Sequence, residues 1–167
     1  IRENRFDRAF LSAYEKQTYG ALGDELALVQ AYLGVLGLRM QARLRVVQDV
    51  PADLRGLPLP PLMLQPLVEN AITHGLEPQI EGGTIQLRAG RNAAQWWLEV
   101  QDDGPGLEGT ASGRGQGSAL ANIRERLACQ FGDRAALTLT PAAPHGTLAR
   151  LTFALPGPAD ADRPPGR

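Results

Sequence analysis

The 167-residue sequence predicts an α+β domain, a two-layer sandwich in which one mixed, mostly antiparallel sheet carries helices on one face. Three observations lead to this class. Apolar residues recur at steps of three and four in separate stretches, which indicates amphipathic helices. Shorter alternating stretches indicate strands. The order along the chain is helix, strand, helix, two strands, long loop, helix and two strands, and the length suits a single core.

The first helix is predicted over residues 24–43, where leucines and a valine repeat with a helical period. The repeating residues are Leu26, Val29, Leu33 and Leu36. Asp24 and Glu25 stand where a helix N-terminus favours negative charge. Residues 44–50 alternate well enough to predict a strand, and Pro51 ends it.

The second helix ends at Gly75, a residue that commonly stops helices. Its start has two alternatives. Pro61 could take the first helical position with a kink at Pro66, or Pro66 could itself be the first residue.

The middle of the chain predicts an antiparallel hairpin followed by a long loop. Residues 84–91 and 95–102 read as two strands joined by a short turn around Asn92. Residues 103–117 contain six glycines, at positions 104, 106, 109, 113, 115 and 117. Such a loop is predicted to be flexible.

The last part predicts a helix over residues 118–131, stopped by Gly132, and two closing strands over 135–140 and 147–155. Residues 157–167 lack large apolar groups and are expected to form a disordered tail. Residues 1–20 are polar and weakly patterned, and they are expected to be the remnant of an upstream segment.

Composition excludes several functions. The net charge is -1, so no basic field points to nucleic acid. Lys16 is the only lysine, so the Gly-Lys-Ser/Thr ending of a Walker-type phosphate loop is absent. Cys129 is the only cysteine and can form no internal disulfide. No apolar run approaches the ~20 residues that span a bilayer.

The first polar cluster lies on the second helix. Asn70 and His74 are four residues apart on one flank of its apolar stripe, and Glu69 lies on the other flank. An asparagine carbonyl is a hard oxygen ligand suited to Mg²⁺, and a glutamate can accept a proton. A solvated helix face would give the same pattern.

Two glycine-rich clusters follow. In residues 102–106, Asp102 could accept a hydrogen bond from an adenine amine while the glycines let the backbone approach a flat base; an ordinary turn is the alternative. In residues 113–120, glycines before a helix start could cradle phosphate, or form a flexible linker.

A fourth cluster, His145-Gly146-Thr147, opens the last strand. The Thr147 hydroxyl could bond Asp102 or a bridging water if the two strands are neighbours. Taken alone, this cluster reads equally as a turn followed by a residue that favours strands.

Together and in this order, the clusters resemble those of the GHKL superfamily, which contains gyrase, the large ATP-driven heat-shock chaperone, histidine kinases and MutL. Residues 69–75 resemble its N box, 102–106 its first glycine box, and 115–120 its second. Residues 62–75 and 122–127 are similar to the autolysin-regulator-type sensor histidine kinases.

This resemblance covers residues 21–156 and implies a Bergerat-type ATP-binding catalytic domain with ATP and Mg²⁺ as cofactors. It implies that Asn70 ligates Mg²⁺, that Glu69 orients or deprotonates the attacking group, and that His74 lies near the phosphates. The implied nucleotide contacts are Asn70, Asp102, Gly104, Gly106, Gly115, Gly117, Ser118, Leu120 and Thr147.

The resemblance also implies partners. The γ-phosphoryl group would pass to a histidine in an upstream helical dimerisation domain of a homodimer, and then to a response regulator. The domain would be the cytoplasmic part of a membrane-anchored protein. An ATP hydrolase of the same superfamily, or a catalytically inactive nucleotide-binding regulatory module, are the alternatives.

Two residues depart from the family pattern. Asp103 stands where asparagine is usual after the adenine-reading aspartate. Ala119 replaces a glycine, and its methyl group is tolerated only if the residue has a negative φ.

Overall fold

The computed structural model describes residues 20–106 and 116–155, with the backbone alone for residues 116–118. Its centre is a five-stranded sheet with the strand order β2-β4-β5-β7-β6. The strands are β2 (Leu44–Asp49), β4 (Gly83–Arg91), β5 (Gln95–Asp102), β6 (Ala135–Pro141) and β7 (Thr147–Ala154). Only β2 and β4 pair in parallel within this sheet. The predicted mixed, mostly antiparallel sheet is confirmed.

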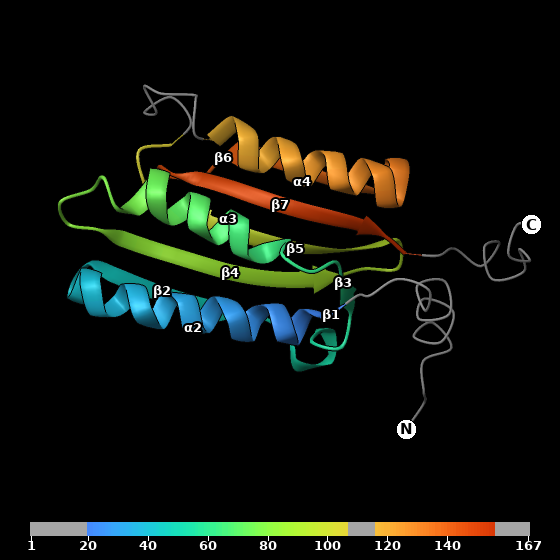
Figure 1. Ribbon diagram of the computed structural model, residues 1–167, viewed down its shortest axis with the longest axis horizontal. Coiled ribbons are helices and arrows are strands. Elements are labelled where there is room, and N and C mark those ends of the chain that lie inside the picture. The colour runs from blue at the N-terminus through green and yellow to red at the C-terminus, as the bar shows by residue number, and fades with distance from the viewer. Residues whose placement is uncertain (1–19, 107–115, 156–167) are drawn as a thin grey trace, which may run out of the picture.

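Three helices lie over the same face of the sheet, as predicted: α2 (Leu22–Met40), α3 (Leu64–Asn70) and α4 (Gln116–Phe131). Figure 1 shows α3 between the other two. A separate pair of short strands, β1 (Gly20–Ala21) and β3 (Pro58–Leu59), joins the start of α2 to the segment before α3.

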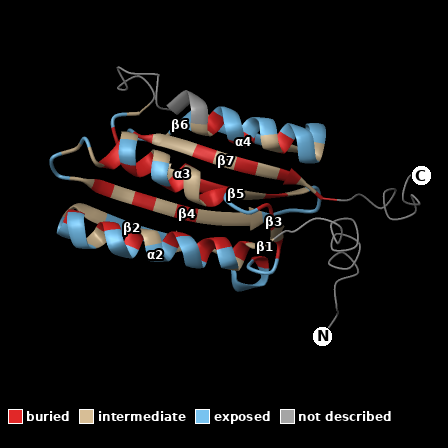
Figure 2. Cartoon of the chain, viewed as in Figure 1, coloured by how far each residue is buried: buried red, intermediate tan, exposed pale blue. Residues whose placement is uncertain are grey.

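The core fills the space between the helices and the sheet. Alternate residues of the central strands point into it, because successive side chains in a strand face opposite sides. Figure 2 shows this alternation of burial along the strands and the exposed outer faces of the helices. Trp96 of β5 stacks on Phe153 of β7 with ring centroids 4.6 Å apart. The end of the sheet where β5 begins is therefore tightly packed.

Most element boundaries fall within two residues of the predictions. The α-helical part of the first helix ends at Met40, and a single 3₁₀ turn, Gln41–Arg43, continues it to the predicted end. The last helix begins at Gln116, two residues earlier than predicted. Gly132 follows it with a φ of 60°, a conformation that glycine adopts at low cost.

The second helix differs from the prediction at both ends. It begins at Leu64, so Pro66 is its third residue and neither alternative was correct. The first four N–H groups of a helix have no intrahelical acceptor, so proline at this position removes no hydrogen bond. The helical segment ends at Leu76, one residue past the predicted end at Gly75, but its last part is an unpredicted π turn, Ala71–Leu76, that contains Gly75.

Several predictions lie outside the described residues. They are Gly115, most of the loop over 103–117, the upstream remnant except Gly20, and the tail over 157–167. In the part of the chain that is described, no helix is long and apolar enough to cross a membrane.

Candidate functional site

One pocket gathers most of the predicted site residues. It is open to solvent, with about 470 Å³ of empty space that includes solvent at its mouth, and it lies between α3, the start of α4 and strands β5, β6 and β7. Six predicted residues line it: Asn70, His74, Asp102, Gly106, Leu120 and Thr147. They come from four separate segments of the chain, so only the fold brings them together.

Asp102 forms the polar floor of the pocket. It is the last residue of β5 and is only 6% exposed. Thr147 lies directly opposite in β7. The backbone N–H of Gly104 donates to Asp102 Oδ1 at 3.0 Å, and the Thr147 backbone donates a second hydrogen bond to the carboxylate. The two strands are therefore neighbours, which meets the condition for a bond from the Thr147 hydroxyl to Asp102; the bond itself stays a prediction.

Burial raises the pKa of Asp102, and the nearby charge of Asp103 raises it further, while the two backbone hydrogen bonds lower it. Burial disfavours the charged form because the interior solvates it poorly. A carboxylate has about four lone-pair sites. Two backbone donors therefore leave acceptor capacity for an N–H group of a ligand in the pocket.

Three glycines allow the chain to close around Asp102. A Cβ atom at Gly75 would lie 2.7 Å from Asp102 Cγ, and one at Gly104 would lie 2.3 Å from the Gly75 carbonyl oxygen. Gly146 has a φ of 114°, and a Cβ there would lie 1.9 Å from the Asp102 carbonyl oxygen. Gly104 is thus buried against Gly75 and does not line the pocket.

Asn70 and His74 lie on the helical wall of the pocket. Asn70 ends α3, and His74 is the fourth residue of the π turn. Both are partly buried. Among the described residues, neither side chain makes a hydrogen bond or ion pair. The amide oxygen of Asn70 and the imidazole of His74 can therefore bind a ligand without breaking a contact between described residues.

The Glu69 side chain lies outside the pocket that Asn70 and His74 line. It is exposed and accepts a hydrogen bond of 3.0 Å from Gln65 Nε2. The pKa of Tyr32 in α2 is raised by burial and by the charge of Glu69, so this carboxylate lies near α2. Glu69 does not line the pocket, and its catalytic role stays a prediction.

The apolar walls of the pocket were missed by the sequence reasoning. They are Leu67, Ala71, Val100, Leu139 and Ala149. Val100 and Ala149 could have been found, because they stand two residues from Asp102 and Thr147 on the same strand faces. Leu139 could not, because its place depends on the β6–β7 register.

The second glycine box is described only in part. Gly115 lies outside the described residues, while Gly117 and Ser118 form part of the first turn of α4. Ala119 is the fourth residue of that helix and is not among the described residues with positive φ. The condition for tolerating its methyl group is therefore met.

Asp103 does not contribute to the pocket wall around Asp102. Its Oδ1 accepts a hydrogen bond of 2.8 Å from the Thr84 backbone N–H at the start of β4. An asparagine oxygen could accept the same bond. The departure from the family pattern thus concerns the pairing of two strands.

Residues 60–157 match the family described as histidine kinase-, DNA gyrase B-, and HSP90-like ATPase. This chain therefore belongs to that ATPase family.

The curated relatives narrow the likeness to sensor kinases. The sensor histidine kinase YesM of Bacillus subtilis is 31% identical over 144 residues, covering 85% of this chain and 25% of the relative. The sensor protein LytS of Staphylococcus haemolyticus is 31% identical over 147 residues, covering 82% and 25%. These matches confirm the resemblance to autolysin-regulator-type kinases. The chain spans about a quarter of the length of these relatives.

A solved structure supports the fold. The catalytic domain of histidine kinase ThkA matches with a TM-score of 0.63 at 15% identity, covering 83% of this chain and 96% of that one. At this identity the likeness concerns the fold alone.

The pocket offers few ligands for a metal ion. The described residues contain no group of three or more His, Cys, Asp or Glu side chains that could hold one. Asn70 offers a single hard oxygen in the pocket. Mg²⁺ keeps several waters and commonly binds through one or two protein oxygens plus substrate phosphates. The donor set therefore fits a Mg²⁺ ion that arrives with a nucleotide.

Proposed function

We propose that the chain is the Mg²⁺-ATP-binding catalytic domain of a two-component sensor histidine kinase. The observation that carries this proposal is the convergence of Asn70, His74, Asp102 and Thr147 on one pocket. These residues supply an adenine acceptor at one end and polar groups for phosphate and metal at the other.

Adenine recognition falls to the floor of the pocket. The buried Asp102 carboxylate accepts the hydrogen bond from the exocyclic amine of the base. The side chains of Val100 and Ala149 stand beside it on the same sheet face and provide apolar contact for the ring. A base without this donor would forgo a hydrogen bond to a charged group, so the floor favours bases that carry it.

The side of the pocket formed by α3 and the start of α4 would hold the phosphates. Asn70 would hold the Mg²⁺ ion through its amide oxygen, and this ion would neutralise phosphate charge. His74, one helical turn further on, lies within the same pocket. The N–H groups at the start of α4 favour anions. Phosphoryl transfer depends mostly on positioning and charge neutralisation, which this set of groups supplies.

The acceptor is proposed to be a histidine outside residues 1–167. The chain contains only two histidines. His74 lines the pocket, and His145 Nδ1 lies 3.2 Å from the Gly104 carbonyl oxygen. We therefore expect this chain to bind ATP without phosphorylating itself. The histidine would belong to an upstream dimerisation domain of a homodimer, the next acceptor would be a response regulator, and the domain would lie on the cytoplasmic side of a membrane-anchored protein.

Binding is tested by calorimetry with ATP, with and without Mg²⁺. We expect saturable binding with one site, strengthened by Mg²⁺, and loss of that Mg²⁺ effect in Asn70→Ala. Absence of heat with Mg²⁺-ATP from the folded wild-type chain would refute the proposal.

Transfer is tested by adding a family-matched acceptor domain in trans and following acid-labile phosphate. The kinase proposal expects label on the acceptor histidine and none on this chain. Rapid ATP turnover without transfer would favour the hydrolase alternative. Tight binding with neither turnover nor transfer would favour the regulatory module.

A further inference from the structure

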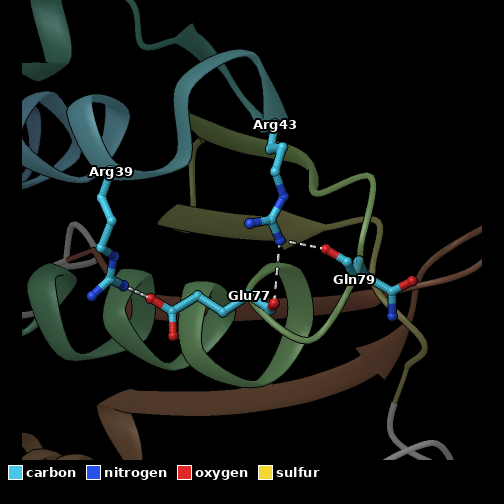
Figure 3. Close-up of polar contacts among 4 residues, drawn as sticks. All are labelled: Arg39, Arg43, Glu77 and Gln79. Atoms are coloured by element: carbon cyan, nitrogen blue, oxygen red, sulfur yellow. Dashed lines mark hydrogen bonds and ion pairs between the residues drawn. The ribbon is translucent and has the colours of Figure 1, made fainter.

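Two arginines, Arg39 in the last turn of α2 and Arg43 at the end of the 3₁₀ turn that follows it, contact the segment that leaves the pocket wall. Arg39 forms an ion pair with the side chain of Glu77. Arg43 Nη2 donates to the carbonyl oxygens of Gln79 at 2.6 Å and of Glu77 at 3.4 Å. These contacts are made with the exit turn, residues 77–82: Figure 3 shows the Arg39 guanidinium directed at the Glu77 carboxylate and the Arg43 guanidinium directed at the turn itself. Neither arginine lines the pocket.

The exit turn follows the π turn that carries His74 and Gly75. The Glu77 N–H donates to the Ile72 carbonyl oxygen at 2.8 Å, which is the five-residue step of a π-helix. A π turn is rare, and it occurs often at functional sites. If it tightened to an α turn, the residues after it would rotate by about 100°, the rotation of one residue in an α-helix. His74 and Gly75 lie inside the turn, so the same change would also alter their positions relative to Asp102.

The exit turn also lies against the backbone of Arg43. Gly82 has a φ of 70°, and a Cβ there would lie 2.0 Å from the Arg43 carbonyl oxygen. The next residue, Gly83, pairs with Leu44 in the parallel β2–β4 ladder. The segment from Arg39 to Leu44 therefore contacts the exit turn and the start of β4 through both side chains and backbone.

We propose that Arg39 and Arg43 are positioning residues for the nucleotide site, because they hold the π turn in the form that places His74 in the pocket and Gly75 beneath Asp102. This inference rests on the proposed function, since it concerns the affinity of the same pocket. Arg43 contributes more to this positioning than Arg39 does. It serves two carbonyl oxygens from a partly buried position, whereas the Arg39 side chain is 66% exposed and exposed ion pairs are weak.

The test measures ATP affinity and thermal unfolding on the same variants, with binding measured well below each unfolding midpoint. Arg43→Met is expected to weaken ATP binding roughly tenfold, a change of ~1.4 kcal/mol, at unchanged stoichiometry. Arg43→Lys keeps one donor group and is expected to recover part of the affinity. Hydrogen exchange should become faster at the amides of residues 73–77 and stay unchanged in β5 and β7.

A charge exchange tests the exposed pair. Arg39→Glu alone should weaken binding about two- to fivefold, the effect of up to ~1 kcal/mol, and Arg39→Glu with Glu77→Arg should restore it. The matched control is Arg91→Gln, which breaks the exposed Arg91–Asp53 pair of 3.4 Å at the other end of β4. It should leave ATP affinity unchanged.

Two failures are distinguishable. A folded wild-type chain that binds no ATP refutes the proposed function. Wild-type binding together with unchanged affinity in Arg43→Met and in Arg39→Glu overturns the positioning role. If Arg43→Met does not fold, Arg43→Lys and the charge exchange decide the question.

Discussion

Gly75→Ala should weaken nucleotide binding more than it weakens the fold. The added Cβ would lie 2.7 Å from Asp102 Cγ and Oδ1, whereas ordinary contacts begin at 3.4 Å. One of the two groups must therefore move by about 0.7 Å. The Asp102 carboxylate is held in place because Gly104 and Thr147 both donate to it. Any shift would displace the proposed acceptor of the adenine amine.

The two effects differ in size. Overpacking costs about 1–3 kcal/mol, while alanine in place of glycine in a helical turn returns about 1 kcal/mol, so unfolding should change by only ~0–2 kcal/mol. A hydrogen bond to a charged group contributes about 1.5–3 kcal/mol. Its loss would weaken ATP binding roughly 10- to 150-fold.

The assay pairs an ATP titration with denaturant unfolding of the same variant. Gly34→Ala is the matched control, because Gly34 lies in α2 and a Cβ there would meet nothing within 4 Å. It should bind ATP normally and gain up to ~1 kcal/mol of stability. A folded Gly75→Ala chain that binds ATP as tightly as wild type would refute the role given to Asp102.

Three further predictions concern the same site. Because the pKa of Asp102 is raised above its ordinary value of 3.8, the folded chain holds this proton longer than the unfolded chain. The stability that this group contributes is therefore present at acid pH and is lost as the pH rises through the raised pKa. Asp102→Asn should remove this pH dependence of the free energy of unfolding, and it should also abolish ATP binding. Asp103→Asn keeps the acceptor for the Thr84 N–H and should unfold like wild type, whereas Asp103→Ala should cost about 1–3 kcal/mol; equal stability of the two variants would contradict the assigned bond. Asn70→Asp keeps an oxygen ligand and adds a charge, so Mg²⁺ should still strengthen ATP binding there, and a variant indifferent to Mg²⁺ would argue against Asn70 as the ligand.

Local patterns in the sequence were sufficient for most of the secondary structure. The leucine repeat of α2 and the alternation of β4 and β5 reflect which face of each element is buried. The sequence shows that face directly, because apolar residues occupy the buried positions. The start of α3 was not predictable in this way. Pro66 is compatible with several positions in a first helical turn, and nothing nearby selects one.

The π turn escaped prediction for a related reason. Gly75 was expected to stop the helix, yet its lack of a side chain accommodates Asp102, a residue 27 positions later in the chain. From a glycine in the sequence one can conclude only that a Cβ is absent. Whether that absence permits a turn or a close approach depends on what the fold brings beside it.

The amino-acid sequence by itself determined the fold class, the order of the elements and the polar clusters, because these depend on local periodicity and on residue chemistry. The tertiary structure alone decided that Asn70, His74, Asp102 and Thr147 share one pocket, that Glu69 lies away from it, and that Arg43 supports the exit turn. Those facts depend on strand register and helix packing, which join residues far apart in the chain through contacts that no local pattern encodes.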